Sequence, residues 1–123
     1  MVALRLSSFD DVRLARECAR DLAHAAGVKD PGAVAQATGE LGNNCVEHGH
    51  QAPALLWIGC REGGVSLRFE NDCPERPNWC TQKPAVFGEI RSGGYGIQIA
   101  RALARSVNCC WSGGRVIVRA EFD

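Results

Sequence analysis

The polar residues Glu40, Asn44 and His48 recur at every fourth position in the run ATGELGNNCVEHGH (37–50), which otherwise has the pattern of an amphipathic helix. Residues four apart lie on one side of a helix, so these side chains are expected to form one stripe. An asparagine oxygen suits a hard cation such as Mg²⁺, and a glutamate one turn away can orient or deprotonate an attacking hydroxyl. The alternative is an ordinary polar flank whose terminal histidine is favoured by the helix dipole. The spacing by itself leaves both interpretations open.

The apolar residues of the same helix predict where this stripe lies. At about 100° per residue they fall within roughly 60° of one another and define a buried face: Val34, Ala37, Leu41 and Cys45. The stripe of Glu40, Asn44 and His48 is centred roughly 60–80° to one side, at the border of the core. Asn43 points almost opposite the buried face, so we expect Asn43 and Asn44 to have different roles.

A glycine-rich turn, SGGYGIQIARAL at 92–103, is the second candidate. Gly94 and Gly96 flank Tyr95 just before an expected helix, so bare backbone N–H groups and a helix N-terminus can meet a phosphate together. A flexible glycine loop is the alternative interpretation, since a lone GxG is weak evidence. A fold that brings this turn to the Glu40–Asn44 stripe would strengthen the case for a site.

The composition is that of an ordinary globular domain. The chain has 123 residues, 46% apolar and 23% charged, which suits one domain over residues 1–123. Acidic and basic residues cancel at 14 each without a dense basic cluster, which argues against charge-driven nucleic-acid binding. The chain start lacks the regions of a signal peptide, and no apolar run reaches membrane-spanning length. We therefore expect a cytoplasmic protein with no nucleic-acid or membrane partner.

Seven cysteines are many for this length: Cys18, Cys45, Cys60, Cys73, Cys80, Cys109 and Cys110. Their number is odd and several lie in apolar periodic segments, so in a reducing compartment we expect buried thiols and not a disulfide framework. A zinc site from Cys73, Cys80 and the Cys109/Cys110 pair is an alternative, but no CxxC or CxxH spacing supports it.

The hydrophobic periodicity predicts the order strand, helix, helix, strand, strand, lid, helix, strand, strand. Strands are expected at 2–7, 54–60, 64–70, 107–112 and 115–122, and helices between Ser8 and Gly27, from Pro31 (capped by Asp30) to near Gly49, and over 96–107. Residues 70–96 show no sustained period and are interpreted as a loop, with the lid at about 72–93. This order predicts an α+β two-layer sandwich: a mixed, mostly antiparallel sheet with three helices on one face.

Taken together, ELGNNCVEHG (40–49) and GGYGIQIARALA (93–104) resemble the N box and the second glycine box of the GHKL (Bergerat-type, histidine-kinase-like) ATPase superfamily. The short length, the strand before two helices and the closing hairpin look most like its small anti-sigma-factor and switch serine-protein-kinase branch, which acts in partner-switching and stressosome systems. The resemblance covers nearly the whole chain in order of elements, and the two motifs are its specific anchors.

The resemblance implies a role for each matched residue. Glu40 matches the catalytic carboxylate that activates a substrate hydroxyl, and Asn44 the asparagine that holds Mg²⁺ against the phosphates. Six further positions match residues that border the nucleotide or let the lid and helix backbone approach its phosphates: His48, Gly49, Gly94, Tyr95, Gly96 and Ile97. Phosphoryl transfer would then rest on positioning and metal electrostatics.

The segment NDCPERP (71–77) departs from the first glycine box of the same family, Asp-x-Gly-x-Gly. Asn71 stands where an aspartate accepts a hydrogen bond from the adenine amine, and its side-chain oxygen can still accept one. Asp72 is the alternative acceptor after a shift of one residue. Cys73 and Glu75 replace the two glycines, which restricts the backbone, and Pro74 removes a donor.

The resemblance implies an ATP- and Mg²⁺-dependent serine/threonine-protein kinase in stress-response signal transduction. Its partner would be a STAS-domain antagonist or a sigma-factor-type regulatory protein, with a homodimer of this chain as a further expectation. The altered first box motivates an alternative, a non-catalytic protein-binding module that keeps the fold but binds nucleotide weakly or not at all. A third hypothesis is thiol-based redox or metal sensing through four cysteines: Cys73, Cys80, Cys109 and Cys110.

Overall fold

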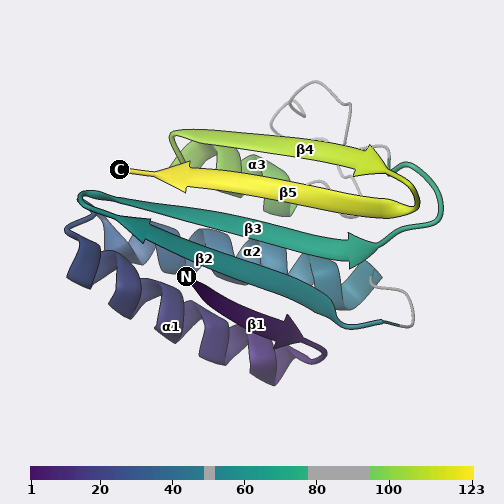
Figure 1. Ribbon diagram of the computed structural model, residues 1–123, viewed down its shortest axis with the longest axis horizontal. Coiled ribbons are helices and arrows are strands. Elements are labelled where there is room, and N and C mark those ends of the chain that lie inside the picture. Colours follow the sequence, from purple (N-terminus) through teal and green to yellow (C-terminus); the bar gives the residue numbers. More distant parts are fainter. Residues whose placement is uncertain (49–51, 78–94) are drawn as a thin grey trace.

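The computed structural model of this protein describes residues 1–48, 52–77 and 95–123. Its strands form one sheet in the order β1-β2-β3-β5-β4, with the helices on one face (Figure 1). In chain order the elements are β1 (Val2–Leu6), α1 (Phe9–Ala26), α2 (Pro31–His48), β2 (Ala54–Arg61), β3 (Gly64–Asp72), α3 (Tyr95–Leu103), β4 (Ser106–Ser112) and β5 (Arg115–Phe122). The expected α+β sandwich is confirmed. Every strand pairing among the described residues is antiparallel, so the sheet is antiparallel there and not mixed as expected.

The first two helices begin and end where local chemistry predicts. The Ser8 side chain accepts a hydrogen bond from the backbone N–H of Asp11, and Gly27 ends α1 with φ 81°, a left-handed conformation that suits glycine. Asp30 Oδ1 accepts from the backbone N–H of Ala33, 3.1 Å away, and so caps α2. None of the helices in the described ranges combines the length and apolar content that a membrane crossing needs.

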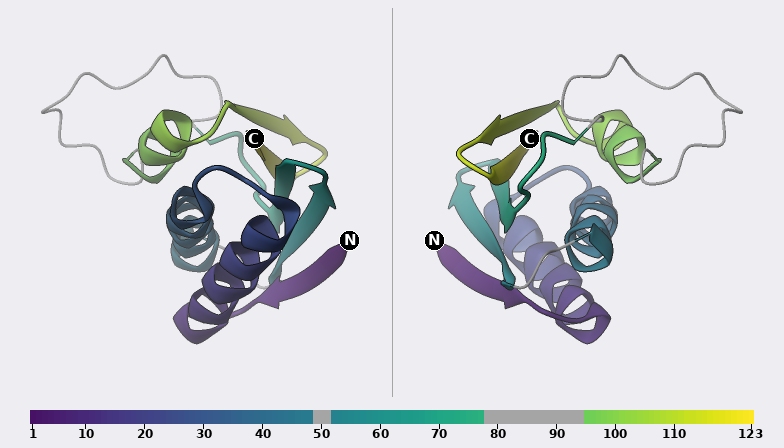
Figure 2. Two further views of the ribbon diagram at one scale, coloured as in Figure 1. Left: turned by 90° about the vertical axis from the view of Figure 1, so that its left-hand side faces the viewer. Right: turned by 90° about the vertical axis from the view of Figure 1, so that its right-hand side faces the viewer.

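The core lies between the sheet and the helices, and α2 is the central helix, between α1 and α3 (Figure 2). On β3, the side chains of Val65, Leu67 and Phe69 alternate toward this core and are each at most 1% exposed. The predicted apolar face of α2 is buried as expected. The helix also approaches α1 closely, because a Cβ on Gly42 would lie 2.9 Å from a methyl group of Val12.

Two element boundaries differ from the expectation. Strand β3 continues to Asp72, so Asn71 and Asp72 belong to the sheet and not to the loop. Helix α3 ends at Leu103, and Val107 lies in β4, although it continues the helical spacing. The backbone N–H of Arg105 already donates to the carbonyl of Glu121 on β5, so pairing with the sheet replaces the last predicted helical turn.

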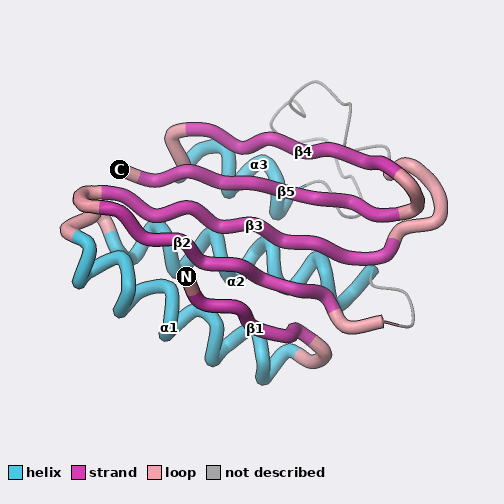
Figure 3. Tube along the Cα trace, in the orientation of Figure 1, coloured by secondary structure: helices cyan, strands magenta, loops and turns pink. Residues whose placement is uncertain are grey.

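The two strand hairpins turn at opposite ends of the sheet (Figure 3). The β4–β5 turn uses Gly113 and Gly114 with φ 60° and 76°, as the glycine pair predicts for a tight hairpin. This turn lies beside the end of β3, because Asp72 is paired with Arg115. The predicted lid, at about 72–93, lies outside the described residues from position 78 onward.

Candidate functional site

The end of α2 and the end of β3 lie at one end of the sheet, and α3 lies alongside α2 (Figure 1). Helix α2 ends at His48, a short connection before β2. Strand β2 runs antiparallel to β3 and pairs Leu55 with Glu70, which brings the end of β3 to the same place. Helix α3 runs back along α2, since Leu103 lines one surface hollow together with Ala33 near the start of α2. The first turn of α3 therefore lies toward the end of α2.

Asn44 and Gly96 are in direct contact across α2 and α3. A Cβ built on Gly96 would lie 2.6 Å from Asn44 Nδ2, 3.1 Å from its Cγ and 3.2 Å from its Oδ1. The first of these distances is shorter than real Cβ contacts allow, so the asparagine amide occupies the space that a side chain at position 96 would need. The structure thus brings the two sequence motifs together at these two residues.

Glu40 lies one helical turn before Asn44 on the same flank of α2. Its side chain is half-buried, and its carboxylate makes no hydrogen bond or ion pair with any described residue. An unpaired carboxylate on the border of the core remains available to accept a proton or orient a hydroxyl. Within the described ranges, Glu40 is therefore available for the role that the resemblance implies.

His48 lies in the last turn of α2 and is exposed. Its Nε2 is 3.8 Å from Glu47 Oε2, a neighbour on the exposed side of the helix. The predicted stripe consequently runs from half-buried Glu40 and Asn44 to a histidine in solvent. Asn43 is also half-buried, but no described hydrogen bond engages its side chain.

Asn71 is the polar residue that β3 directs toward the helices. It continues the inward row of Leu67 and Phe69 and is only 8% exposed. Its backbone pairs with Val116, yet its amide side chain makes no hydrogen bond with the described residues. The amide atoms are not among the fully shielded side-chain atoms that lack a partner in the described ranges, so the amide still reaches solvent and can meet a ligand.

Asp72 does not join this group, because successive residues of a strand face opposite sides of the sheet. Its Oδ1 accepts a hydrogen bond from Arg115 Nη1, 3.1 Å away, and the same arginine lies 3.5 Å from Glu70 Oε2. These side chains lie on the face without helices. Of the two acceptors proposed from the sequence, Asn71 lies on the helix side of the sheet and Asp72 on the other side.

The remaining predicted residues divide into two groups. Ile97 is 2% exposed and packs in the core, so only its backbone can meet a ligand. Gly49 and Gly94 lie outside the described residues, as does the side chain of Tyr95.

Strand β3 is followed by a segment held against the β4–β5 hairpin. The backbone N–H of Cys73 donates to the carbonyl of Gly114, at 2.7 Å, and the indole N–H of Trp111 donates to the carbonyl of Cys73, at 2.8 Å. The Cys73 thiol also donates to the carbonyl of Glu75. The role of Trp111 as an anchor was not expected, because nothing local in the sequence links it to a segment so distant along the chain.

The cysteine hypotheses find little support in the described residues. No group of three histidine, cysteine, aspartate or glutamate side chains there could hold a metal ion, and Cys80 lies outside those ranges. Burial raises the pKa of the Cys45 thiol to about 12, which keeps it protonated at neutral pH. Cys45 is therefore a core residue, as the helical spacing predicts.

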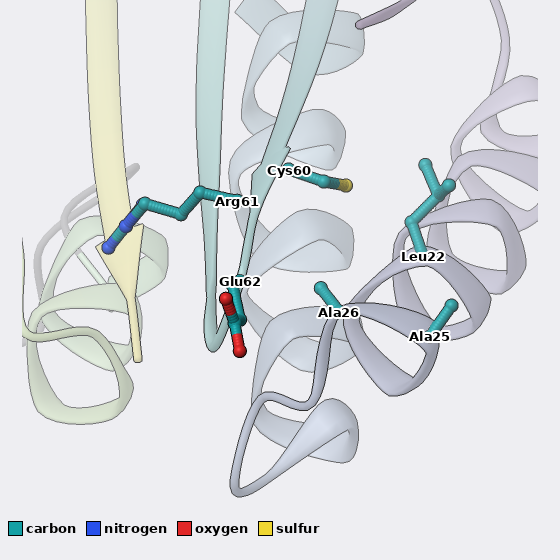
Figure 4. Close-up of a pocket in the computed structure, with 6 residues that line it drawn as sticks. All are labelled: Leu22, Ala25, Ala26, Cys60, Arg61 and Glu62. Atoms are coloured by element: carbon teal, nitrogen blue, oxygen red, sulfur yellow. The ribbon is translucent and has the colours of Figure 1, made fainter.

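A second surface hollow lies at the other end of the molecule, where the β2–β3 turn meets the end of α1 (Figure 4). Cys60 points toward α1 there, whereas Arg61 points to the other side of the sheet. Apart from the ends of Arg61 and Glu62, small and apolar side chains line the hollow, and none of the predicted site residues contributes to it. The candidate site is therefore the group at the opposite end, formed by Glu40, Asn44, Asn71 and Gly96.

Comparison with known proteins agrees with this geometry. Residues 7–122 match the model of one protein family, the histidine kinase-like ATPase domain. No curated protein was found to match the chain. The family model spans nearly the whole chain and includes all four residues of the candidate site, so this protein belongs to the histidine kinase-like ATPase family.

Proposed function

We propose that this protein binds ATP with Mg²⁺ at the group formed by Asn44, Gly96 and Asn71, and transfers the γ-phosphoryl group to a serine or threonine of a partner protein. Membership of the ATPase family implies nucleotide binding. The observation that carries the proposal is the contact of the Asn44 amide with Gly96, because it joins a metal-ligating side chain to a helix N-terminus.

The residues present fit a magnesium–triphosphate group. Asn44 offers a neutral oxygen of the kind that Mg²⁺ accepts, and the first turn of α3 offers backbone N–H groups to phosphate oxygens. Gly96 lets both approach the same place, since it has no Cβ. When bound, the metal ion neutralises charge on the phosphates.

Glu40 is the proposed general base. Its carboxylate is half-buried and unpaired within the described residues, so it can accept the proton of a substrate hydroxyl. Because it lies one turn from Asn44, the hydroxyl would be held close to the phosphates. Such positioning accounts for most of the catalysis expected in phosphoryl transfer.

Asn71 is the proposed contact to the base. A buried amide without a partner among the described residues can accept a hydrogen bond from an exocyclic amine through its oxygen. Its position on β3, in line with Phe69, would set the nucleotide over the inner face of the sheet.

The partner is the least constrained part of the proposal. The resemblance of residues 40–49 and 93–104 to the anti-sigma and switch-kinase branch supports a STAS-domain antagonist or a sigma-factor-type regulator. A role in stress-response partner switching follows from the same resemblance. The expected site of action is cytoplasmic.

A second candidate is a non-catalytic binding module of the same fold. It is favoured by the segment after β3, where both glycines of the first box are replaced and Cys73 is bonded to Gly114 and Trp111. A backbone held against the β4–β5 hairpin has less freedom to open for a base. In this case the fold would present its surface to a partner without turnover.

A phosphotransfer assay separates the two candidates. The protein is incubated with labelled ATP, Mg²⁺ and a STAS-domain partner protein, in parallel with Glu40→Gln. The proposal predicts label on the partner with the wild-type protein and at least a hundredfold slower transfer by the variant, since general-base catalysis contributes about 10²–10⁴-fold. Transfer at the same rate by both proteins would show that Glu40 is not the base, and the absence of both ATP binding and transfer would favour the binding module.

A further inference from the structure

The face of the sheet opposite the helices is covered by no described element (Figure 2). Strand alternation and register assign its central side chains, which we call the open face: Arg5 on β1, Leu55, Trp57 and Arg61 on β2, Ser66, Arg68, Glu70 and Asp72 on β3, and Arg115, Ile117, Arg119 and Glu121 on β5. The open face is separated from the candidate nucleotide site by the sheet itself, because the side chain of Asn71 faces the helices.

Positive charge is concentrated on the open face. The whole chain has equal numbers of acidic and basic residues, but this face carries five arginines against three carboxylates. All three carboxylates are already engaged by arginines of the same face, such as Glu70 by Arg68 and Arg115. Arg5 and Arg119 have no ion pair with any described residue. The open face therefore has two unpaired cations available to an anionic partner.

Two of these arginines are paired directly across neighbouring strands. Arg68 on β3 is opposite Arg119 on β5, and like charges in that position destabilise a sheet. Arg68 Nε is only partly compensated: Glu70 Oε1 is 3.0 Å away, but Nε makes no hydrogen bond of acceptable geometry among the described residues. The repulsion between Arg68 and Arg119 lowers the stability of the free protein. Such a pair is expected at a site where a bound anion relieves the repulsion.

Trp57 supplies an apolar and aromatic centre beside these charges. The guanidinium of Arg68 lies 5.2 Å from the centroid of its ring, within range of a cation–π interaction. The Trp57 indole N–H is shielded from solvent and has no acceptor among the described residues. Leu55 and Ile117 flank the charged row and are half-buried. Tryptophan and arginine are the side chains most enriched in the energetic centres of protein interfaces.

We propose that the open face docks an acidic segment of a partner protein, with carboxylates on Arg119 and Arg5 and apolar side chains on Trp57 and Leu55. This surface is distinct from the nucleotide site and goes beyond the proposed function. Charge complementarity would set the rate and the specificity of the encounter.

The chemistry of the open face disfavours other occupants. A nucleic acid would bring its phosphates onto Glu70, Asp72 and Glu121, which are interspersed among the arginines. A second copy of the chain would present the same excess of arginines, so like charges would meet. An acidic protein segment matches both the charge and the apolar centre.

The test is a titration of the ¹⁵N-labelled full chain with a synthetic peptide of alternating glutamate and leucine, followed by NMR. A peptide of alternating lysine and leucine and a duplex oligonucleotide serve as comparison probes. We expect the glutamate peptide to shift the Trp57 indole signal, assigned with Trp57→Phe, and the backbone signals of β3 and β5. Arg119→Glu should weaken binding about tenfold at low salt, and added salt should narrow that difference.

Two variants make this test specific. Lys29→Glu reverses an exposed charge at the α1–α2 connection and should bind the peptide as the wild type does. Asn44→Ala should also bind normally, because the nucleotide site is on the other side of the sheet, so failure of the kinase proposal would leave this result unchanged. Shifts confined to the helices, equal binding by Arg119→Glu, or tighter binding of the lysine peptide or the oligonucleotide would overturn the proposal. A wild-type dimer that Arg119→Glu dissociates would assign the open face to a second copy instead.

Discussion

Replacing Gly96 by alanine tests the contact on which the candidate site depends. The added Cβ would lie 2.6 Å from Asn44 Nδ2, about 0.8 Å closer than an ordinary contact of 3.4 Å. The asparagine side chain can retreat, because it is partly exposed and makes no described hydrogen bond. We therefore expect the variant to fold, with the Asn44 amide displaced from the N-terminus of α3.

The expected effect on ATP affinity can be worked out from this displacement. A hydrogen bond to a charged group contributes about 1.5–3 kcal/mol, which corresponds to a roughly ten- to 150-fold rise in Kd for ATP in the presence of Mg²⁺. The effect on stability should be smaller. Alanine in a helix gains up to about 1 kcal/mol over glycine, and this offsets part of the strain from overpacking.

Calorimetric titration with ATP and Mg²⁺ measures the affinity, and urea unfolding measures the stability. Gly59→Ala is the matched control, because a Cβ there would meet nothing within 4 Å. It should bind ATP as the wild type does. If Gly96→Ala binds ATP as tightly as the wild type while remaining folded, the Asn44–Gly96 contact is not part of a nucleotide site.

Three further predictions concern single residues. Glu40→Gln should keep the ATP affinity of the wild type within about threefold but lose phosphoryl transfer, because the carboxylate acts on the hydroxyl and not on the nucleotide; calorimetry and the transfer assay measure the two properties separately. Asn71→Leu should weaken ATP binding by about tenfold or more, whereas Asp72→Asn should change it less than twofold, since Asp72 lies on the other face of the sheet. Calorimetric titration of both variants with ATP measures this, and a larger loss of affinity in Asp72→Asn would contradict the assignment of Asn71 as the base contact. Burial raises the pKa of Cys45 to about 12 from 9.0. The thiol therefore ionises at lower pH in the unfolded chain than in the folded protein. The free energy of unfolding should fall as pH rises from 9 toward 12, by about 1.4 kcal/mol per pH unit. Urea titrations at alkaline pH should show this decline in the wild type, and Cys45→Ala should lack that component of it.

The sequence predicted those parts of the fold that depend on local rules. Ser8, Gly27 and Asp30 mark helix ends through their own hydrogen bonds or backbone conformation, and each was placed correctly. Alternation identified the buried face of β3 without knowledge of its neighbours. The predicted end of α3 was wrong, because the position of Val107 depends on its pairing with β5, which helical spacing cannot reveal.

The residues of the candidate site could be named from the sequence, but their arrangement in space could not. Glu40 and Asn44 share a helix flank by spacing alone, whereas the contact of Asn44 with Gly96 depends on how α3 packs along α2. The choice between Asn71 and Asp72 required the register of β3, because a shift of one residue turns a side chain to the other face of the sheet. The anchoring of Cys73 by Trp111 is likewise a tertiary contact with no local signal in the sequence.

The central claim is that Asn44 helps to bind ATP with Mg²⁺ at this end of the sheet. Calorimetric titration of the wild-type protein and of Asn44→Ala tests it most directly, with and without Mg²⁺. The account predicts saturable binding at micromolar ATP by the wild type, weakened at least tenfold when Mg²⁺ is removed or Asn44 is replaced. No binding by the wild type, or equal binding by the two proteins in Mg²⁺, would contradict it.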